Sequence, residues 1–245
     1  MPLPKISTPT YELTLPSTGK KIKYRPFLVR EEKVLILAME SENTTQITNA
    51  VKNTLKDCIQ TRGIKVDELP TFDIEYLFLN IRGKSVGESV DLVVTCPDDE
   101  ETTVPVKIYI DEIEISKDDE HNRDIELGGG LTLRMKYPSL KQFVQSNFDF
   151  SADDESLDKS FEIISSCIDM IFNEDDAWSA SDCTKKELLS WLDGLNSAQF
   201  KSIEKFFETM PKLSHTIKIT NPKTKVESEV TLEGCLLYTS DAADE

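Results

Sequence analysis

The sequence predicts an α+β fold: an N-terminal β-hairpin, helical segments, and two zinc-ribbon-like β-hairpins with most metal ligands lost, forming a mixed sheet with a C-terminal helical bundle. Two patterns predict it. Apolar residues alternate with polar ones in some segments, which is typical of strands with one buried face. In others they recur every three or four residues, which is typical of amphipathic helices. The chain has 245 residues, 38% of them hydrophobic, so it is long enough to bury a core.

The N-terminal quarter begins with a hairpin and continues with two helices. Residues 11–15 and 21–25 alternate around a Pro-Ser-Thr-Gly turn. Residues 31–42 are rich in helix formers, and apolar residues recur at helical spacing over 47–58. We expect two consecutive helices with a break near Asn43.

The middle of the chain changes from helical to strand periodicity. Apolar residues over 74–81 predict a short amphipathic helix that Gly83 closes. Residues 90–94 and 104–110 alternate on either side of a polar tip, which predicts a second hairpin. Residues 113–115 extend the sheet.

Another hairpin and a helical region follow. Residues 125–133 are predicted to form a hairpin around a triple-glycine turn. Two capping-box pairs predict helix starts: Ser139 with Gln142, and Thr184 with Glu187. An apolar stripe predicts a central helix: Leu157, Phe161, Ile164, Ile168 and Ile171. Two further helical faces and two strands complete the chain: 188–192 and 200–207, then 216–220 and 226–232.

We expect residues 1–234 to form one α+β region, sub-divided into a mixed part (1–137), a helical part (138–212) and a returning hairpin (213–234). Residues 235–245 read CLLYTSDAADE. This string resembles the in-frame translation of a transposase-type sequencing-library adapter. It is therefore interpreted as a non-native tail and kept out of the fold.

The charge balance bears on partners and compartment. The chain carries 28 Lys plus Arg against 45 Asp plus Glu, a formal net charge of −17. Nucleic acids and anionic membranes are bound through clustered Lys and Arg, so neither is an expected partner. The N-terminus lacks the apolar run of a secretory signal, and the apolar run 34–39 is far shorter than the ~18 residues that span a bilayer. A cytoplasmic protein with reduced thiols is expected.

Two similar segments have the outline of a zinc ribbon. Residues 93–99 and 218–224 each run from a strand into Thr-x-Pro and a polar tip. In zinc ribbons, a Cys-x-x-Cys at each tip supplies two of four thiolates. The four corresponding positions are Cys96, Asp99, Asn221 and Thr224. Because only Cys96 is a thiolate, we expect no metal and no other cofactor; the two tips pack together and their polar turns satisfy the backbone.

The sequence offers no catalytic constellation. It has two histidines, His121 in an Asp-rich loop and His215 before a strand. It has no Gly-x-Ser-x-Gly elbow, no phosphate-binding glycine loop and no His-Glu-x-x-His motif. The acidic runs do not match the spacing of a calcium-binding loop and are interpreted as solvated charges. No enzyme activity, catalytic residue or small-molecule substrate is predicted.

Several strings, taken in order, are similar to one known family. They are 24–33 (YRPFLVREEK), 72–78 (FDIEYLF), 81–87 (IRGKSVG), 184–195 and 199–213. In this order they resemble the baseplate hub proteins of T-even-type contractile phage tails, and the likeness runs over most of residues 9–234.

The resemblance implies a non-enzymatic protein that helps to build the central hub of the baseplate. Its partners would be other hub or tail proteins, met in the host cytoplasm during assembly or in the tail baseplate of the virion. Docking would use acidic loops to guide basic partner surfaces, and apolar patches for affinity. Members often carry Cys pairs at the hairpin tips, so Asp99, Asn221 and Thr224 depart from the pattern, which puts metal in doubt but not the fold.

Three alternatives stay open at this point. A transient tail-assembly chaperone would be absent from finished virions. An acidic DNA-mimic inhibitor would need its carboxylates in one continuous stripe. A metal-dependent hydrolase would need a stoichiometric metal.

Overall fold

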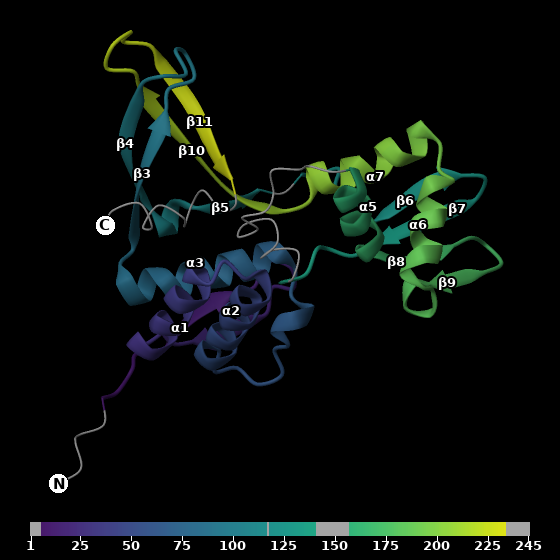
Figure 1. The fold of residues 1–245 in the computed structure, drawn as a ribbon, viewed down its shortest axis with the longest axis horizontal. Helices are drawn as coiled ribbons and strands as arrows, with labels where there is room; N and C mark the ends of the chain where they lie inside the picture. The colour runs from purple at the N-terminus through teal and green to yellow at the C-terminus, as the bar shows by residue number, and fades with distance from the viewer. Residues whose placement is uncertain (1–5, 117, 141–156, 234–245) are drawn as a thin grey trace. The chain divides into compact units, whose positions relative to one another are not determined.

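The computed structural model describes residues 6–116, 118–140 and 157–233. The chain divides into two compact units (Figure 1), one from residues 1–116 and 212–245 and the other from 117–211. The expected boundary between 137 and 138 therefore falls inside the second unit, because the strand that ends at Met135 pairs with the strand that begins at Ile168.

The first unit combines three helices with small antiparallel sheets. Its elements are β1 (Tyr11–Thr14), β2 (Lys21–Tyr24), α1 (Val29–Glu40), α2 (Thr44–Cys58), α3 (Thr71–Val86), β3 (Ser89–Thr95), β4 (Thr103–Tyr109), β5 (Glu114–Ser116), β10 (Lys212–Thr220) and β11 (Glu227–Glu233). The pairs are β1 with β2, β3 with β4, and the order β11-β10-β5. The predicted N-terminal hairpin, the two consecutive helices and both later hairpins are confirmed.

The core of this unit lies between the N-terminal hairpin and the helices. In β2, the buried residues Ile22 and Tyr24 alternate with exposed lysines, so one face of the strand points into the core. Helices α2 and α3 contribute apolar residues at helical spacing: Ile47, Val51, Leu55, Ile74, Leu77 and Ile81. Asp73, in the first turn of α3, is fully buried and accepts a hydrogen bond from the backbone N–H of Ser17 (3.0 Å). This bond ties the β1–β2 turn to the helix.

Gly83 does not end the third helix as predicted. Helix α3 continues to Val86, and Gly87, at φ 141°, follows it. A Cβ at Gly83 would lie 2.7 Å from Ile110 Cδ1. The glycine therefore serves close packing of α3 against residues 110–112, a use that helical spacing does not reveal.

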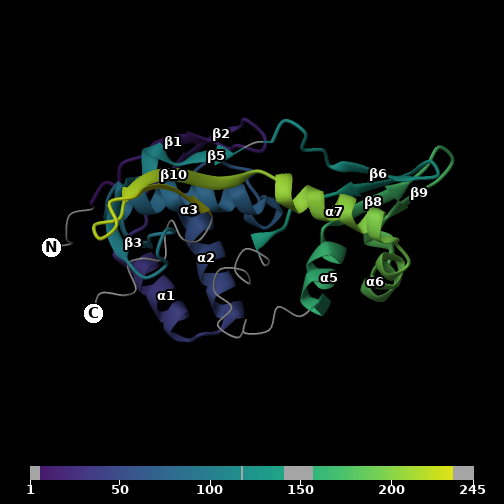
Figure 2. The same cartoon turned by 90° about the horizontal axis from the view of Figure 1, so that it is seen from above.

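In its described residues, the second unit packs three helices on one sheet. Its elements are β6 (Asp124–Gly128), β7 (Leu131–Met135), α5 (Leu157–Ser166), β8 (Ile168–Phe172), β9 (Ala177–Ser179), α6 (Lys185–Asp193) and α7 (Ser197–Thr209). The strands form an antiparallel sheet in the order β6-β7-β8-β9. Figure 2 shows α5 and α6 on one side of this sheet. A core of apolar side chains joins sheet and helices: Leu133, Met135, Ile164, Ile168, Leu192, Ile203 and Phe206.

The expected helix through Ile171 is wrong in its second half. Helix α5 ends at Ser166, and the N–H of Cys167 bonds the carbonyls of Ile163 and Ile164. Residues 168–172 then form β8, which pairs with β7 on one side and β9 on the other. Because such a strand is apolar on both faces, its residues also match a helical stripe.

Two other expectations change. Within the described residues, the strands form four small antiparallel sheets instead of one mixed sheet, and the C-terminal helices lie on a sheet instead of forming a bundle.

The Thr184–Glu187 capping box is confirmed, whereas Gln142 lies outside the described residues. No helix in the described part of the chain has the length and apolar character needed to cross a membrane.

Candidate functional site

The tips of the hairpins β3–β4 and β10–β11 lie side by side in the first unit (Figure 1). Side chains join them directly. Asn221 Nδ2 donates to both carboxylate oxygens of Asp98, at 3.0 and 3.1 Å. The hydroxyl of Thr224 also donates to Asp98. The carboxylate of one tip therefore binds two polar side chains of the other, and these bonds lower the pKa of Asp98.

The two tips share one backbone form. The N–H of Glu100 bonds the carbonyl of Cys96 at 2.9 Å, and the N–H of Lys225 bonds the carbonyl of Asn221 at 2.9 Å. Glu100 and Lys225 both have positive φ, 55° and 65°. Cys96 and Asn221 thus occupy equivalent turn positions, and so do Asp99 and Thr224, in keeping with the spacing of the two segments.

The polar side chains of each tip also satisfy their own turn. Asp99 accepts from the N–H groups of Thr102 (3.0 Å) and Glu101 (3.2 Å) and from the Thr102 hydroxyl. These bonds hold the pKa of Asp99 well below its usual range. Asn221 Oδ1 accepts from the N–H of Lys223 at 2.8 Å. The backbone of both turns is therefore satisfied by side-chain oxygens.

The residues at the tips do not fit a zinc ion. Cys96 is 1% exposed, and burial together with the charges of Asp98 and Asp99 raises the pKa of its thiol. A protonated thiol is a poor ligand, and the Asp99 carboxylate is already used by its own turn. Within the described residues, no three His, Cys, Asp or Glu side chains gather where they could hold a metal.

The two histidines lie in different units, and each makes hydrogen bonds within its own unit. His121 stacks on Tyr137 and bonds its hydroxyl (3.0 Å), while its other ring nitrogen bonds Thr209 (3.0 Å). Burial lowers the pKa of His121. His215 Nδ1 bonds the carbonyl of Glu112 at 3.0 Å. The triple glycine forms the β6–β7 turn with positive φ at each residue. None of these groups makes a nucleophile–base pair in the described structure.

The comparison with protein families gives one match. A family model described as T4 bacteriophage base plate protein matches residues 8–236. The chain belongs to the T4 bacteriophage base plate protein family. No curated protein and no solved structure matches the chain.

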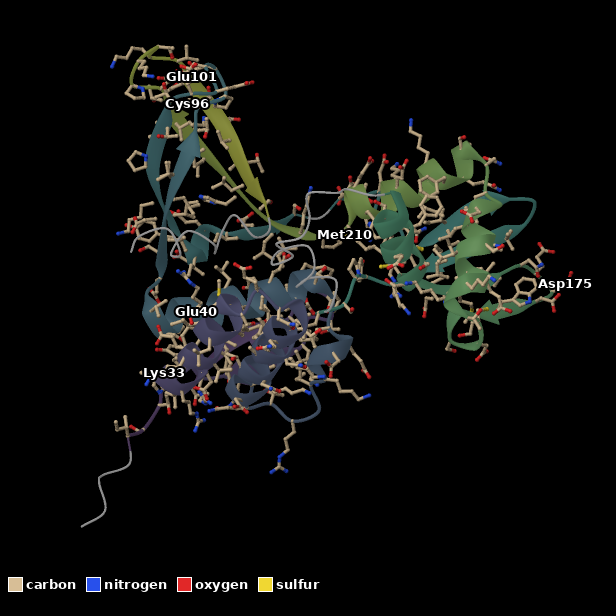
Figure 3. All side chains as sticks on the ribbon, in the orientation of Figure 1. Lys33, Glu40, Cys96, Glu101, Asp175 and Met210 are labelled. Atoms are coloured by element: carbon tan, nitrogen blue, oxygen red, sulfur yellow. The ribbon has the colours of Figure 1, made fainter. Side chains whose placement is uncertain are left out.

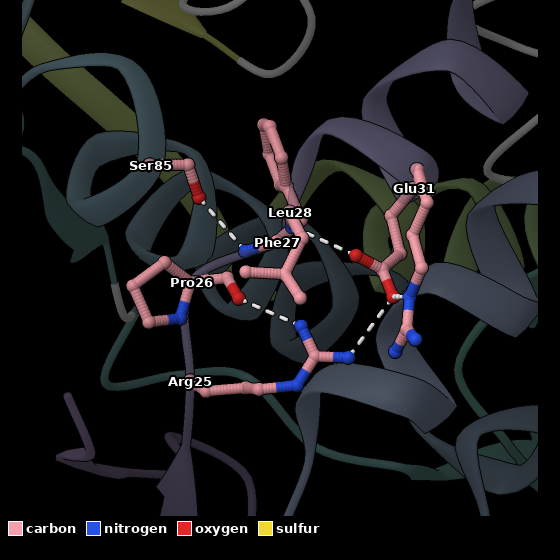
Figure 4. Close-up of polar contacts among 7 residues, drawn as sticks. Arg25, Pro26, Phe27, Leu28, Glu31 and Ser85 are labelled. Carbon is pink, nitrogen blue, oxygen red and sulfur yellow. Dashed lines mark hydrogen bonds and ion pairs between the residues drawn. The ribbon is translucent and has the colours of Figure 1, made fainter. Parts of the chain in front are cut away.

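In this base plate protein, the string 24–33 forms a buried polar network at the start of α1 (Figure 4). Arg25 Nη2 donates to Glu31 Oε1 at 3.0 Å, and Arg25 Nη1 donates to the carbonyl of Pro26 at 2.9 Å. The other Glu31 oxygen accepts from the N–H of Leu28 at 2.7 Å. The carboxylate thereby caps the helix from inside the core.

Charge holds this network together. Burial alone would raise the pKa of Glu31, but hydrogen bonds from Arg25, Arg30 and Leu28 outweigh it and lower the pKa to about 2. The Arg30 Nε contact is 2.6 Å. The first turn of α1 is therefore anchored to Arg25, the residue that follows β2, and the opposite face of the helix is left to solvent.

Sequence reasoning missed the residue that joins the base plate protein's two tips. The zinc-ribbon comparison pointed to Asp99, one position beyond Asp98. The signal available was the Cys-Pro-Asp-Asp string, in which two adjacent carboxylates must point in different directions. Asp99 turns back to its own N–H groups, so Asp98 is the one that reaches Asn221.

Proposed function

We propose that this base plate protein is a structural or assembly protein of the hub of a contractile phage tail baseplate, that it acts by docking to other tail proteins, and that it is not an enzyme. The family match over residues 8–236 is the observation that carries the proposal. The net charge of −17 and the structural settings of both histidines support it.

The β3–β4 hairpin has the composition of a docking surface. Asp98 and Asp99 are engaged within the tips, which leaves Glu100 and Glu101 exposed at the end of a braced turn (Figure 3). On the outward face of the hairpin, Val93 is 71% exposed. An acidic tip beside an exposed apolar side chain suits a partner with a basic rim, because charge guides the encounter and apolar contact supplies affinity.

Virion composition tests the role. Mass spectrometry of purified virions is expected to detect the protein at a fixed ratio to other baseplate proteins, and a phage with the gene disrupted is expected to lack assembled baseplates. If the gene-disrupted phage lacks baseplates but the protein is absent from wild-type virions, the transient tail-assembly chaperone would be favoured. Normal tails without the gene would refute both assembly roles.

A charge-reversed pair tests the docking surface. Glu100→Lys with Glu101→Lys is expected to weaken binding to the hub or tail protein that the wild-type chain captures by at least tenfold, and more at low salt than at high salt. The matched control is Glu174→Lys with Asp175→Lys, which adds the same charge to the β8–β9 turn. Equal loss in both variants would show a general charge effect and reject this surface.

A further inference from the structure

Helix α1 leaves an aliphatic face uncovered in the described structure. Val29, Ile36 and Leu37 are 64%, 50% and 64% exposed, whereas Glu31 and Ala38 on the opposite face are buried. At roughly 100° per residue, the three exposed side chains fall within about a third of the helix circumference. Branched aliphatic side chains gathered in this way on a surface helix indicate an interface.

Two opposite charges lie within the same face. Lys33 and Glu40 are both exposed (Figure 3), and at roughly 100° per residue their positions fall between those of the aliphatic residues around the helix. Neither takes part in an ion pair among the described residues that the structure records. Within the face these two charges balance, and the cation and the anion each lie about one helical turn from its centre, on opposite sides of it.

We propose that this α1 face, formed by Val29, Lys33, Ile36, Leu37 and Glu40, binds a second copy of the chain with the two α1 helices antiparallel. The proposal goes beyond the baseplate role and does not depend on it. The carrying observation is that the face is complementary to itself when the chain direction is reversed.

The complementarity follows from residue positions. A two-fold axis between Ile36 and Leu37 places each residue opposite the one that is equally far from the axis in the other direction. Ile36 then meets Leu37 of the partner subunit. Lys33 and Glu40 lie about 5 Å to either side along the helix, at 1.5 Å per residue, so Lys33 meets Glu40 of the partner subunit and Glu40 meets Lys33 of the partner subunit.

Other arrangements lack this match. In a parallel pair, Lys33 would face Lys33 of the partner subunit and Glu40 would face Glu40 of the partner subunit, and both contacts are repulsive. A strongly acidic or strongly basic partner would gain from one of the two charges and lose from the other. The antiparallel pair satisfies both charges and covers Ile36 and Leu37, whereas Val29 falls opposite position 44, beyond the end of α1 at Glu40.

The contact is small, so the dimer should be weak. One short helix face on each side buries less than the ~1,200 Å² of a stable standard interface. We expect the full chain to move from monomer to dimer between low micromolar and high micromolar concentration in sedimentation equilibrium. Added salt should weaken the dimer, because salt screens the Lys33–Glu40 pairs.

Charge reversal and its repair test the geometry. Leu37→Glu is expected to abolish dimerisation. Lys33→Glu and Glu40→Lys are each expected to weaken it at least tenfold, and the double variant Lys33→Glu with Glu40→Lys is expected to restore it. All of these side chains are exposed, and circular dichroism verifies the fold. Val86→Glu, at an exposed apolar position on α3, is the matched control and should dimerise as the wild type does.

Three results would overturn the proposal. They are a wild-type chain that remains monomeric across this range, single charge variants that dimerise normally, and a double variant that does not regain the dimer. Binding of a different tail protein to this face, with no self-association, would also count against it. None of these results bears on the presence of the protein in virions, so the baseplate role is tested separately.

Discussion

Glu75 makes the stability of the first unit depend on pH. It lies on α3, and burial raises its pKa from 4.5 to about 7. A carboxyl whose pKa is raised by folding stabilises the folded state fully below pH 4.5, where both states are protonated. This stabilisation is lost as pH rises from 4.5 through 7, where the folded state must hold a buried charge. Glu75→Gln keeps the shape of the protonated side chain and removes the titration.

The size of the effect follows from the shift. A difference of about 2.5 pKa units at about 1.36 kcal/mol each gives an upper bound of about 3.4 kcal/mol. Because the Glu75 side chain keeps partial contact with solvent, we expect Glu75→Gln to be about 2 kcal/mol more stable than wild type at pH 8. Near pH 4.5 we expect the two proteins to be equally stable.

Hydrogen exchange of peptides from α3, with urea as a mild denaturant, is the appropriate assay. Both tryptophans, Trp178 and Trp191, lie in the second unit, so their fluorescence reports a part of the chain that this substitution should leave unchanged. Glu42→Gln, at an exposed position, is the matched control. A Glu75→Gln variant whose advantage is the same at pH 4.5 and pH 8, or absent at both, would refute the reasoning.

Three further substitutions test the packing of the units. Glu31→Gln should lower the free energy of unfolding by about 3–5 kcal/mol at pH 7, measured by hydrogen exchange in α1, because it leaves the buried Arg25 without its carboxylate. In the wild type, the stabilisation from this carboxylate should fall as pH drops from about 4.5 towards 2, since folding lowers the pKa of Glu31. Asn221→Ala should cost about 1–3 kcal/mol and raise exchange at both hairpin tips, and protection of the tip around Asp98 equal to wild type would contradict the bridge. Thr184→Ala removes the N-cap of α6 and should cost about 1 kcal/mol by urea unfolding followed at Trp191, whereas an unchanged midpoint would show that the cap is dispensable.

Much of the fold could be predicted because local patterns decide it. The β1–β2 hairpin alternates cleanly between Leu13 or Ile22 inside and charged residues outside, and tertiary structure does not override it. The spacing of apolar residues does not distinguish a helix from a strand where a segment carries apolar residues on both faces. Residues 168–172 satisfy a helical stripe and a buried strand equally well, and the choice depends on pairing with β7, a partner more than thirty positions away.

The network at α1 shows a different limit of sequence reasoning. The Arg25–Glu31 pair is recognisable as a family string, yet neither charge could be predicted to be buried from the pattern alone, since Glu31 sits among exposed charged residues. Glu31 can be buried because Arg25, which follows β2, and the N–H of Leu28 both donate hydrogen bonds to its carboxylate. The exposed face of α1 could not be predicted for the same reason. A helix rich in apolar residues predicts that the apolar face is buried, whereas in α1 the buried face carries Glu31.

The paired tips show how two hairpins can be held together without a metal ion. A metal would hold the two turns by four bonds to one ion, whereas here each turn satisfies its own N–H groups through Asp99 or Asn221, and a single carboxylate spans the gap. The arrangement needs acceptors at the ends of the turns and a donor pair opposite Asp98, which Asn221 and Thr224 supply. A cysteine at position 99 would remove the acceptor for Thr102 without completing a metal site. Conversion to a metal-binding form with four thiolates would therefore require at least three changes together, and each single step should loosen the tip.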